Sequence, residues 1–293
     1  MKYRVMVTGA AGQLGYDVVK IFRAGGHEVM ACDREQLDIT DQQQCRDTIN
    51  AFQPHIIVHC AAYTAVDKAE TDEDMAYTVN VTGTRNIAVA AEKVKAKLIY
   101  ISTDYVFDGT ATRPYQEYDS TSPQTVYGKS KLAGERVVES LCTRWFIIRT
   151  SWVFGVHGSN FVKTMLELLE KRPRLQVVHD QQGSPTYTVD LARLVSNLSL
   201  TEKYGIYHAS NSGTCTWYEF AQAIAEEASK QSRFKQNAVL EPCTTGQFPR
   251  PAPRPQYSVM DHLAIRTNGL PPMRAWREAL IAFLNELSVQ QSE

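Results

Sequence analysis

Several features that would indicate particular classes of protein are missing from this sequence. No apolar run approaches the roughly 20 residues that a helix needs to cross a bilayer. Lysine and arginine number 31 against 32 aspartates and glutamates, so the net charge of −1 offers no basic excess for nucleic acid or an anionic membrane. There is no internal repeat, and 293 residues suit one large domain or two modest ones.

The reactive-residue motifs of several enzyme classes are also missing. The six cysteines, at positions 32, 45, 60, 142, 215 and 243, form no CxxC pair, so we expect reduced, mostly buried thiols in a cytoplasmic protein. No HExxH or paired histidines indicate a metal, and no GxSxG marks a hydrolase elbow. The sequence thus predicts no metal ligand.

What the first half contains is a regular alternation of short apolar runs and helical patterns. Continuous β-branched runs separated by helices are typical of a parallel sheet covered on both faces, and right-handed crossovers make such a sheet doubly wound. We therefore predict an α/β, Rossmann-type domain over residues 1–151. Its expected strands are 3–7, 28–32, 55–60, 97–102 and 145–150, with helices near 12–25, 41–52, 72–93 and from 126.

The pattern loosens after Thr150. Helices are expected near 159–171, 188–200, 217–230 and 274–288, with a short strand at 205–210. We interpret residues 152–293 mainly as a smaller α/β substrate-binding cap, with some segments returning to the first domain. The proline-rich stretch "FPRPAPRP" (248–255) could be a ligand for a polyproline-binding module, but an ordered loop of the cap is favoured because structured-looking sequence flanks it.

A glycine turn follows the first predicted strand. The sequence "TGAAGQLG" places Gly9 where a tight turn is needed, Gly12 where a pyrophosphate would approach the backbone, and Gly15 where helix and strand pack closely. The helix that starts here would present free N–H groups to phosphate. In this strand-turn-helix context the motif favours a dinucleotide site over a turn without a ligand.

The residues after the second strand leave the choice of dinucleotide open. Asp33 could accept hydrogen bonds from an adenosine ribose, which favours NAD, whereas Arg34 could receive a 2′-phosphate. Asp38 could meet an adenine amino group or serve as a helix N-cap. The sequence therefore predicts NADH or NADPH without choosing between them.

Two tyrosine–lysine pairs with i, i+4 spacing occur, and their location distinguishes them. A dinucleotide enzyme needs a proton donor, and a cation one helical turn from a tyrosine lowers its pKa. Tyr16 and Lys20 lie on the helix that opens at the glycine turn. Tyr127 and Lys131 begin a helix after the fourth strand, whose carboxyl end is "ISTD", where the ligands of open α/β sheets bind. We expect the second pair to be catalytic.

Other candidates follow from the same edge of the sheet. Thr103 and Asp104 end the fourth strand, so a hydroxyl there could bond both the substrate oxygen and the tyrosine. Trp152 follows the fifth strand and could form an aromatic wall or lie in the core. Arg254, between prolines, could hold a nucleotide diphosphate or lie on the surface. Asn160 and Lys163 share a helix face and could meet the same diphosphate.

These motifs together resemble the extended short-chain dehydrogenase/reductase superfamily. "TGxxGxxG", a Ser/Thr ending strand four, "YxxxK" and "NVTGTRN" (80–86) carry that resemblance. Within the superfamily the chain looks like the dTDP-4-dehydrorhamnose reductase family over nearly its whole length. That resemblance rests on "CAAYTAVDKAE" (60–70), "STDYVFDG" (102–109), "SPQTVYGKSKLAGE" (122–135), "RTSWVFG" (149–155), "NFVKTML" (160–166), "DQQGSPT" (180–186) and "RPQYS" (254–258).

The resemblance implies NAD(P)H-dependent reduction of the C4 ketone of dTDP-4-dehydro-β-L-rhamnose, the last step in making dTDP-β-L-rhamnose for surface polysaccharides. It implies that Tyr127 donates the proton, that Lys131 lowers its pKa and binds the nicotinamide ribose, and that Thr103 polarises the substrate. Asp104 and Trp152 match substrate-contacting positions. The matching cofactor-contacting positions are Gln13, Leu14, Asp38, Ile39, Ala61, Ala62, Tyr63 and Thr64. Some members use magnesium at a dimer contact, which leaves magnesium and a homodimer open.

Two alternative functions remain at this point. A nucleotide-sugar 4-epimerase, dehydratase or other 4-ketoreductase would share the "YxxxK" chemistry. A dehydratase usually has an Asp-Glu pair beside the strand-four hydroxyl, and Tyr105 stands where the glutamate would be. A non-catalytic regulatory subunit of the same fold would be free to lose the tyrosine, lysine or hydroxyl, and all three are present.

Overall fold

The computed structural model describes residues 2–231 and 238–290. Its largest element is a parallel sheet in the order β10-β5-β4-β3-β1-β2. The strands are β1 (Arg4–Thr8), β2 (Glu28–Cys32), β3 (Ile56–His59), β4 (Lys97–Thr103), β5 (Trp145–Thr150) and β10 (Gly205–His208). The sequence order reverses between β1 and β3, which is where a doubly wound sheet binds its ligand. The predicted fold class is confirmed.

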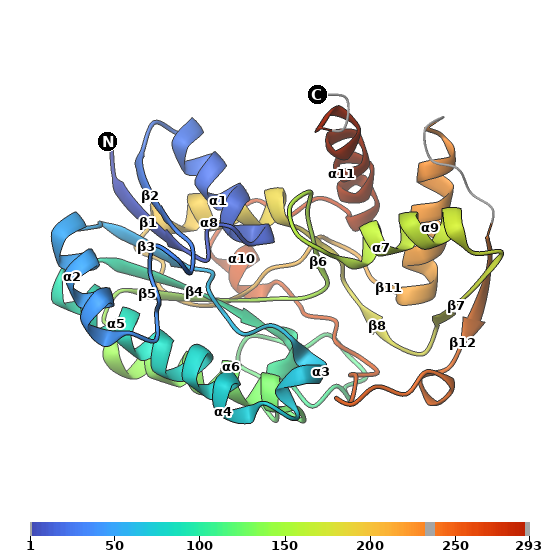
Figure 1. The fold of residues 1–293 in the computed structure, drawn as a ribbon, viewed down its shortest axis with the longest axis horizontal. Coiled ribbons are helices and arrows are strands. Elements are labelled where there is room, and N and C mark those ends of the chain that lie inside the picture. The colour runs from blue at the N-terminus through green and yellow to red at the C-terminus, as the bar shows by residue number, and fades with distance from the viewer. Residues whose placement is uncertain (1, 232–237, 291–293) are drawn as a thin grey trace.

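Helices cover both faces of this sheet (Figure 1). One face carries α1 (Gln13–Ala24) and α8 (Thr188–Ser199), packed together. The other carries α2 (Gln42–Phe52), α5 (Thr84–Lys93) and α6 (Val126–Leu141). The expected helix over 72–93 is divided into α4 (Glu73–Tyr77), a π-helical turn η1 (Thr78–Gly83) and α5; π-turns are frequent at functional sites.

The C-terminal half contributes to both parts of the molecule. The strand expected in the cap, at 205–210, forms β10 and pairs in parallel with β5, so it completes the main sheet. In α8, Leu191, Leu194, Val195 and Leu198 are buried in the same core as Val18 and Phe22 of α1. Burial of this apolar face explains why α8 also lies against the first domain.

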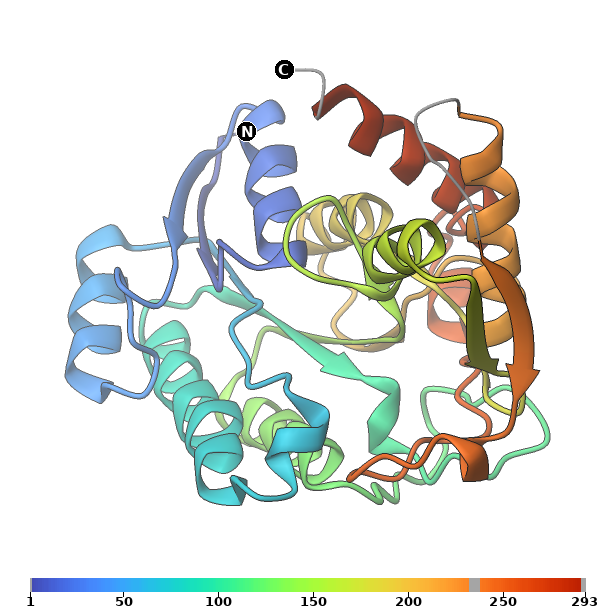
Figure 2. The ribbon, with the colours of Figure 1, turned by 45° about the vertical axis from the view of Figure 1, so that its right-hand side comes forward.

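The remaining elements form a smaller layer beside the sheet (Figure 2). It contains α7 (Phe161–Lys171), α9 (Trp217–Ser229) and α11 (Trp276–Gln290), with strand pairs β7 (Arg174–Val178) and β12 (Val239–Cys243), β6 (Val153–Phe154) and β9 (Thr186–Tyr187), and β8 (Gln182–Gly183) and β11 (Cys215–Thr216). Its core is aromatic: Phe154, Tyr187, Phe220 and Phe283 are buried together. Short elements α3 (Val66–Ala69), η2 (Asp104–Val106), η3 (Thr245–Gln247) and α10 (Leu263–Thr267) complete the chain.

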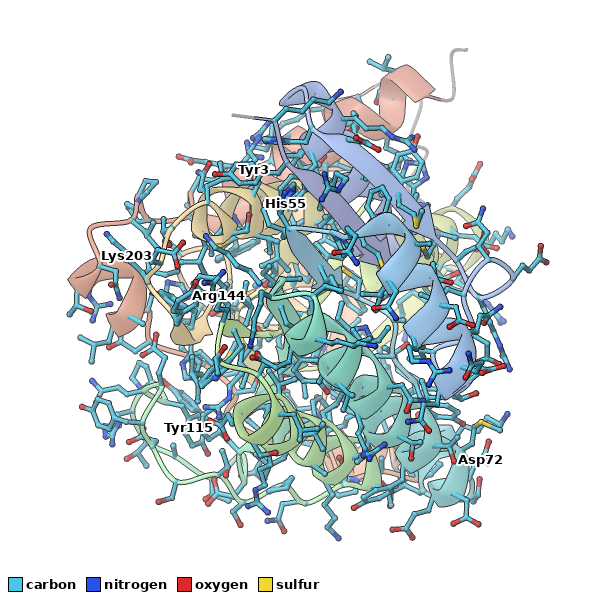
Figure 3. The ribbon with its side chains drawn as sticks, turned by 90° about the vertical axis from the view of Figure 1, so that its left-hand side faces the viewer. Tyr3, His55, Asp72, Tyr115, Arg144 and Lys203 are labelled. Atoms are coloured by element: carbon cyan, nitrogen blue, oxygen red, sulfur yellow. The ribbon has the colours of Figure 1, made fainter. Side chains whose placement is uncertain are left out.

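Tyrosine and histidine rings pack at the amino edge of the sheet. Figure 3 shows Tyr3 and His55 together at the start of β1 and β3, where their ring centroids lie 5.9 Å apart. The backbone N–H groups of Tyr3 and Arg4 donate to Nδ1 of His27 (3.2 Å) and His55 (2.9 Å). The polar strand ends that the sequence singles out lie at the opposite, carboxyl edge.

A buried ion pair ties α6 to that carboxyl edge. The Glu135 carboxylate is 2.7 Å from Nη2 of Arg149, accepts Nε of Arg149 at 3.0 Å and also accepts the Ser102 hydroxyl. Glu135 and Arg149 are each at most 3 % exposed. One carboxylate therefore joins α6 to the ends of β4 and β5.

Glu135→Gln should lower the free energy of unfolding by about 3 kcal/mol or more, because it leaves the Arg149 guanidinium buried without its counter-charge. The midpoint of urea unfolding measures this. Glu139→Gln, an exposed position one helical turn further along α6, is the matched control and should change stability by less than about 0.5 kcal/mol. Equal midpoints for the two variants would show that the pair contributes little.

Candidate active site

A large cavity lies beyond the carboxyl ends of the strands. Its volume is about 1280 Å³, which is enough for a dinucleotide together with a second ligand. One side is formed by the glycine turn and the ends of β3 and β4, and the other by α7, β7 and the segment 248–255. Both halves of the chain therefore contribute walls to one site.

The glycine turn is shaped by contacts that exclude side chains. Gly9 has φ of +64°, and a Cβ on Gly15 would lie 2.1 Å from the Gly9 carbonyl oxygen. A Cβ on Gly12 would meet only that oxygen, at 3.2 Å, and Gly12 is the N-cap of α1 without a side-chain cap. By contrast, α2, α6, α7 and α9 are capped by side chains. The first-turn N–H groups of α1 are thus left for a phosphate, and the turn fits a dinucleotide.

The acidic residues after β2 mainly organise turns in the cavity wall. Asp33 Oδ1 accepts the backbone N–H groups of Glu35 (2.9 Å) and Gln36 (3.0 Å). Asp38 Oδ1 accepts both the N–H and the hydroxyl of Thr40, which lowers the pKa of Asp38. Asp41, not Asp38, caps α2. The exposed Arg34 also lines the cavity.

Asn80 in the π-helical turn connects the cofactor side to α6. Its amide oxygen accepts the Tyr63 N–H at 2.8 Å, while its amide nitrogen donates to the Tyr63 carbonyl (3.1 Å) and the Ser130 hydroxyl (2.9 Å). Ser130 lies between Tyr127 and Lys131 on α6. The predicted wall residues Leu14, Ile39, Ala61, Ala62, Tyr63 and Thr64 all line the cavity.

Tyr127, Thr103 and Asp104 meet in the cavity wall. Burial raises the pKa of Tyr127 to about 12, a hydrogen bond with Thr103 opposes this, and the nearby Asp104 charge raises it. The Thr103 hydroxyl donates to Asp104 Oδ1 at 2.9 Å. Asp104 Oδ2 is buried without a partner among the described residues, and burial raises the Asp104 pKa to about 6. Tyr105 contacts the Tyr127 ring edge-on, with centroids 5.6 Å apart.

Lys131 is 2 % exposed and lies in the cavity wall. Its Nζ donates to the Ile101 carbonyl at 2.6 Å and lies 4.0 Å from the Tyr100 ring centroid. Burial lowers the Lys131 pKa to about 7, while Glu135 and Cys60 oppose the decrease. The sequence predicts that Lys131 lowers the Tyr127 pKa. In the structure the influence that lowers it comes from Thr103, and the Lys131 ammonium donates to a strand carbonyl.

The other tyrosine–lysine pair has surface contacts. The exposed Tyr16 ring stacks on His157 with centroids 3.4 Å apart. Lys20 pairs with Glu286 at 2.9 Å. Both residues lie outside the set that lines the cavity. The sequence analysis likewise favours a non-catalytic position for Tyr16 and Lys20.

Trp152 forms an aromatic wall in an unusual backbone conformation. Its φ is +47°, a region that costs energy for a residue with a bulky side chain. The indole stacks on Trp217 with centroids 3.6 Å apart and an interplanar angle of 10°. A Cβ on Gly183 would lie 2.5 Å from the indole, so the glycine of "DQQGSPT" provides its space. Trp152 is thus held at the cavity rather than in the core.

Asn160 and Lys163 are used differently from the sequence expectation. Asn160 caps α7 by accepting the Lys163 N–H at 3.1 Å, and its amide donates to Gln13 Oε1 at 3.0 Å. Lys163 Nζ donates to the carbonyls of Val156 and Gly158. Neither residue lines the cavity. The structure does not bring this pair to the substrate side, because their polar groups are taken up in shaping the loop before α7.

Arg254 does line the cavity, and it has neighbours that sequence reasoning missed. Its Nη2 pairs with Asp67 Oδ2 at 2.8 Å. The same cavity is also lined by Trp217, Phe161, Phe248 and Arg250. Phe248 and Arg250 belong to the proline-rich stretch, so its prediction as an ordered loop of the cap could have pointed to them. No sequence pattern predicts the stack of Trp217 on Trp152.

Across residues 2–231 and 238–290, no three His, Cys, Asp or Glu side chains gather as metal ligands would. In the same part of the chain no helix combines the length and apolar character of a membrane span.

A glycine turn at the switch point of a doubly wound sheet, with a Ser/Thr, Tyr and Lys set at the ends of β4 and α6, defines a short-chain dehydrogenase/reductase of the extended type. Comparison with known proteins narrows this class. Residues 2–289 match the family described as RmlD substrate binding domain. The chain belongs to this family, which confirms the resemblance seen in the sequence.

Individual relatives cover nearly the whole chain. The spore coat polysaccharide biosynthesis protein SpsK of Bacillus subtilis (strain 168) is 46% identical over 97% of this chain and 98% of its own. A dTDP-4-dehydrorhamnose reductase of Aggregatibacter actinomycetemcomitans is 42% identical over 94% and 97%. The crystal structure of dTDP-4-dehydrorhamnose reductase from Bacillus anthracis str. Ames in complex with NADP has a TM-score of 0.94 at 44% identity, covering 98% and 100%.

Asp104→Asn should stabilise the protein at neutral pH, because it removes a carboxylate that the fold disfavours. The pKa of Asp104 is about 6 in the folded state against 3.8 for the ordinary group. Below the lower value the carboxyl is protonated in both states and costs nothing; above the higher value the cost is complete. We therefore expect a gain of up to about 3 kcal/mol at pH 8 that shrinks toward pH 4, measured by urea unfolding.

The exposed Asp74→Asn is the control for this experiment and should show no such pH dependence. A variant Asp104→Asn that is less stable than the wild type at pH 8 would contradict the assignment of an unfavourable buried carboxylate.

Proposed function

We propose that this protein catalyses the NAD(P)H-dependent reduction of the C4 ketone of dTDP-4-dehydro-β-L-rhamnose to dTDP-β-L-rhamnose. This is the last step of dTDP-rhamnose biosynthesis for surface polysaccharide, and we place it in the cytoplasm. The observation that carries the proposal is the meeting of Tyr127, Thr103 and Lys131 in the wall of a cavity that runs from the glycine turn to an aromatic, cationic region. Membership of the RmlD family supports the choice of substrate.

The chain's own groups supply everything but the hydride. A bound nicotinamide cofactor supplies a hydride to the carbonyl carbon. Tyr127 donates the proton to the C4 oxygen. The Thr103 hydroxyl, which donates to Asp104 in this structure, would turn its proton to the same carbonyl and polarise it. Because burial holds the Tyr127 pKa at about 12, the phenol keeps its proton at neutral pH until negative charge develops on the substrate oxygen.

Lys131 and Asn80 complete the cofactor side. The Lys131 ammonium, held by the Ile101 carbonyl, is placed to hold ribose hydroxyls beneath Tyr127. A pKa near 7 makes its charge responsive to ligands, so a bound hydroxyl pair and the Glu135 carboxylate would favour the charged form. Asn80 fixes the Tyr63 backbone and Ser130 together, which sets the distance between cofactor wall and proton donor.

The opposite end of the cavity suits a nucleotide sugar. Trp152 and Trp217 offer a stacked aromatic face for a sugar or base ring. Asp104, with its unpartnered oxygen, faces the reacting end, where it can bond a sugar hydroxyl. Arg254 and Arg250 also line the cavity, and their guanidinium groups match a diphosphate.

Dehydration is disfavoured by Tyr105. In a dehydratase an acidic residue would stand beside Asp104, whereas here Tyr105 lies edge-on against Tyr127 and fills that place with a ring. A non-catalytic role is disfavoured because tyrosine, lysine and hydroxyl are present and converge. Another dTDP-linked 4-keto sugar remains the alternative substrate.

Tyr127→Phe should reduce turnover by about 10²-fold or more, because the proton donor is lost while the cavity keeps its shape. The assay is oxidation of NADPH or NADH, followed by absorbance, with enzymatically made dTDP-4-dehydrorhamnose. Tyr16→Phe keeps its ring against His157 and should leave the rate unchanged. Unchanged turnover in Tyr127→Phe would remove the assignment of the proton donor.

Arg34→Ala should raise the KM for NADPH about tenfold and leave the KM for NADH nearly unchanged. Arg34 is exposed at the cavity, whereas the neighbouring Asp33 carboxylate is already engaged by two backbone N–H groups. We therefore expect the wild type to use both cofactors and to prefer NADPH. Parallel KM measurements with the two cofactors provide the internal control, and an equal change for both would show that Arg34 does not read the 2′-phosphate.

A further inference from the structure

The proline-rich segment that carries Arg254 is attached to the cofactor half through Asp67. Asp67 lies on α3, directly after the loop that forms the cofactor wall. Its Oδ2 is 2.8 Å from Nη2 of Arg254, and its Oδ1 accepts the backbone N–H of Ala252 at 3.3 Å. Arg254 Nη1 donates to the Ala252 carbonyl at 3.0 Å. One carboxylate thus fixes both the guanidinium and the backbone from which it extends. Figure 2 shows the segment after β12 running back toward α3.

The same segment is fixed from its other side. A Cβ on Gly109 would lie 2.5 Å from Pro255 Cβ, so Pro255 packs directly on that glycine. The Tyr257 N–H donates to the Gly109 carbonyl at 3.0 Å, and the Gln182 N–H donates to the Gln256 carbonyl at 2.8 Å. Arg254 therefore extends from a backbone with little freedom, and its direction depends on Asp67.

The exposure and the surroundings of the Arg254 guanidinium indicate a role in ligand binding. The side chains of Arg254 and Asp67 are 20% and 32% exposed, so the guanidinium stays partly accessible from the cavity that it lines. The Arg254 charge acts on Tyr105, where it lowers a pKa that burial raises, and Tyr105 contacts Tyr127. The guanidinium thus lies close to Tyr105, which contacts the proposed proton donor, in the wall of the cavity that we assign to a nucleotide sugar.

We propose that Asp67 is a positioning residue that aims the Arg254 guanidinium at the diphosphate of the nucleotide sugar. The inference rests on the proposed function and adds to it a residue that does not itself line the cavity. A planar guanidinium binds two phosphate oxygens well only in one orientation, so fixing it beforehand removes an entropic cost from binding. Asp67 would therefore act on affinity for the diphosphate and not on the chemical step.

A double-mutant cycle tests this coupling. Binding of dTDP, measured by calorimetry in the presence of NADP, is compared for the wild type, Asp67→Ala, Arg254→Ala and the double variant. We expect each single change to weaken dTDP binding about tenfold and the double variant to be no weaker than Arg254→Ala. With the full substrate, Asp67→Ala should raise the KM in proportion, leaving kcat within about twofold and the KM for NADPH unchanged.

The conservative and control variants separate positioning from a general structural effect. Asp67→Asn keeps one acceptor oxygen, which can serve Arg254 or the Ala252 N–H but not both, so it should restore part of the affinity lost in Asp67→Ala. Asp74→Ala, an exposed carboxylate on the nearby α4, should change nothing. Tighter dTDP binding in Asp67→Asn would show that Asp67 acts by repelling the diphosphate, and would overturn the proposal.

The remaining outcomes separate the role of Asp67 from the proposed function. Unchanged dTDP affinity in Asp67→Ala, additive losses in the double variant, or a loss in kcat at constant KM would each overturn the role of Asp67 while leaving the proposed reductase intact. A wild type that neither binds dTDP nor reduces the substrate would overturn the proposed function itself, and the inference with it.

Discussion

The buried ion pair between Glu135 and Arg149 is the contact on which the geometry of the catalytic groups depends. Glu135 lies one helical turn after Lys131, Arg149 lies at the end of β5, and the Ser102 hydroxyl that shares the carboxylate directly precedes Thr103. A desolvated carboxylate is costly unless every partner stays in place. The helix that carries Tyr127 and the strand that carries Thr103 therefore cannot shift relative to each other without exposing an unpaired charge.

Around this fixed frame the site accepts several unfavourable arrangements. The Lys131 ammonium is desolvated, one oxygen of Asp104 is buried without a partner among the described residues, and Trp152 has a positive φ. Each of these costs free energy, and all three residues lie in the cavity wall. Unfavourable arrangements at a ligand site are expected where function and not stability selects the residue. The packed sheet and the aromatic core of the smaller layer supply the stability that offsets them.

What the sequence predicts well is what local pattern determines. The alternation of apolar runs and helices, the glycine turn and the placement of Tyr127, rather than Tyr16, at the cavity follow from spacing and strand order. The sequence did not predict which sheet β10 joins, because a strand of four residues has the same pattern in either sheet. Its pairing with β5 and the burial of α8 on α1 place β10 in the main sheet. The stack of Trp152 on Trp217 brings together residues 65 positions apart, which no local pattern encodes.

Polar residues near a site show the same limit, since a helix cap and a phosphate ligand use the same side chains. Asn160 and Lys163 have the composition of a diphosphate site, yet their groups hold the loop before α7 over the glycine turn. That loop lies so close that a Cβ on Gly158 would be 2.9 Å from Gln13 Cγ. This loop contacts the cofactor half through the hydrogen bond from Asn160 to Gln13 and the stack of His157 on Tyr16, which are contacts between uncharged or aromatic groups. The buried ion pair, by contrast, holds the helix and the strands that carry the groups of proton transfer. The two ends of the cavity are therefore held by contacts of different kinds.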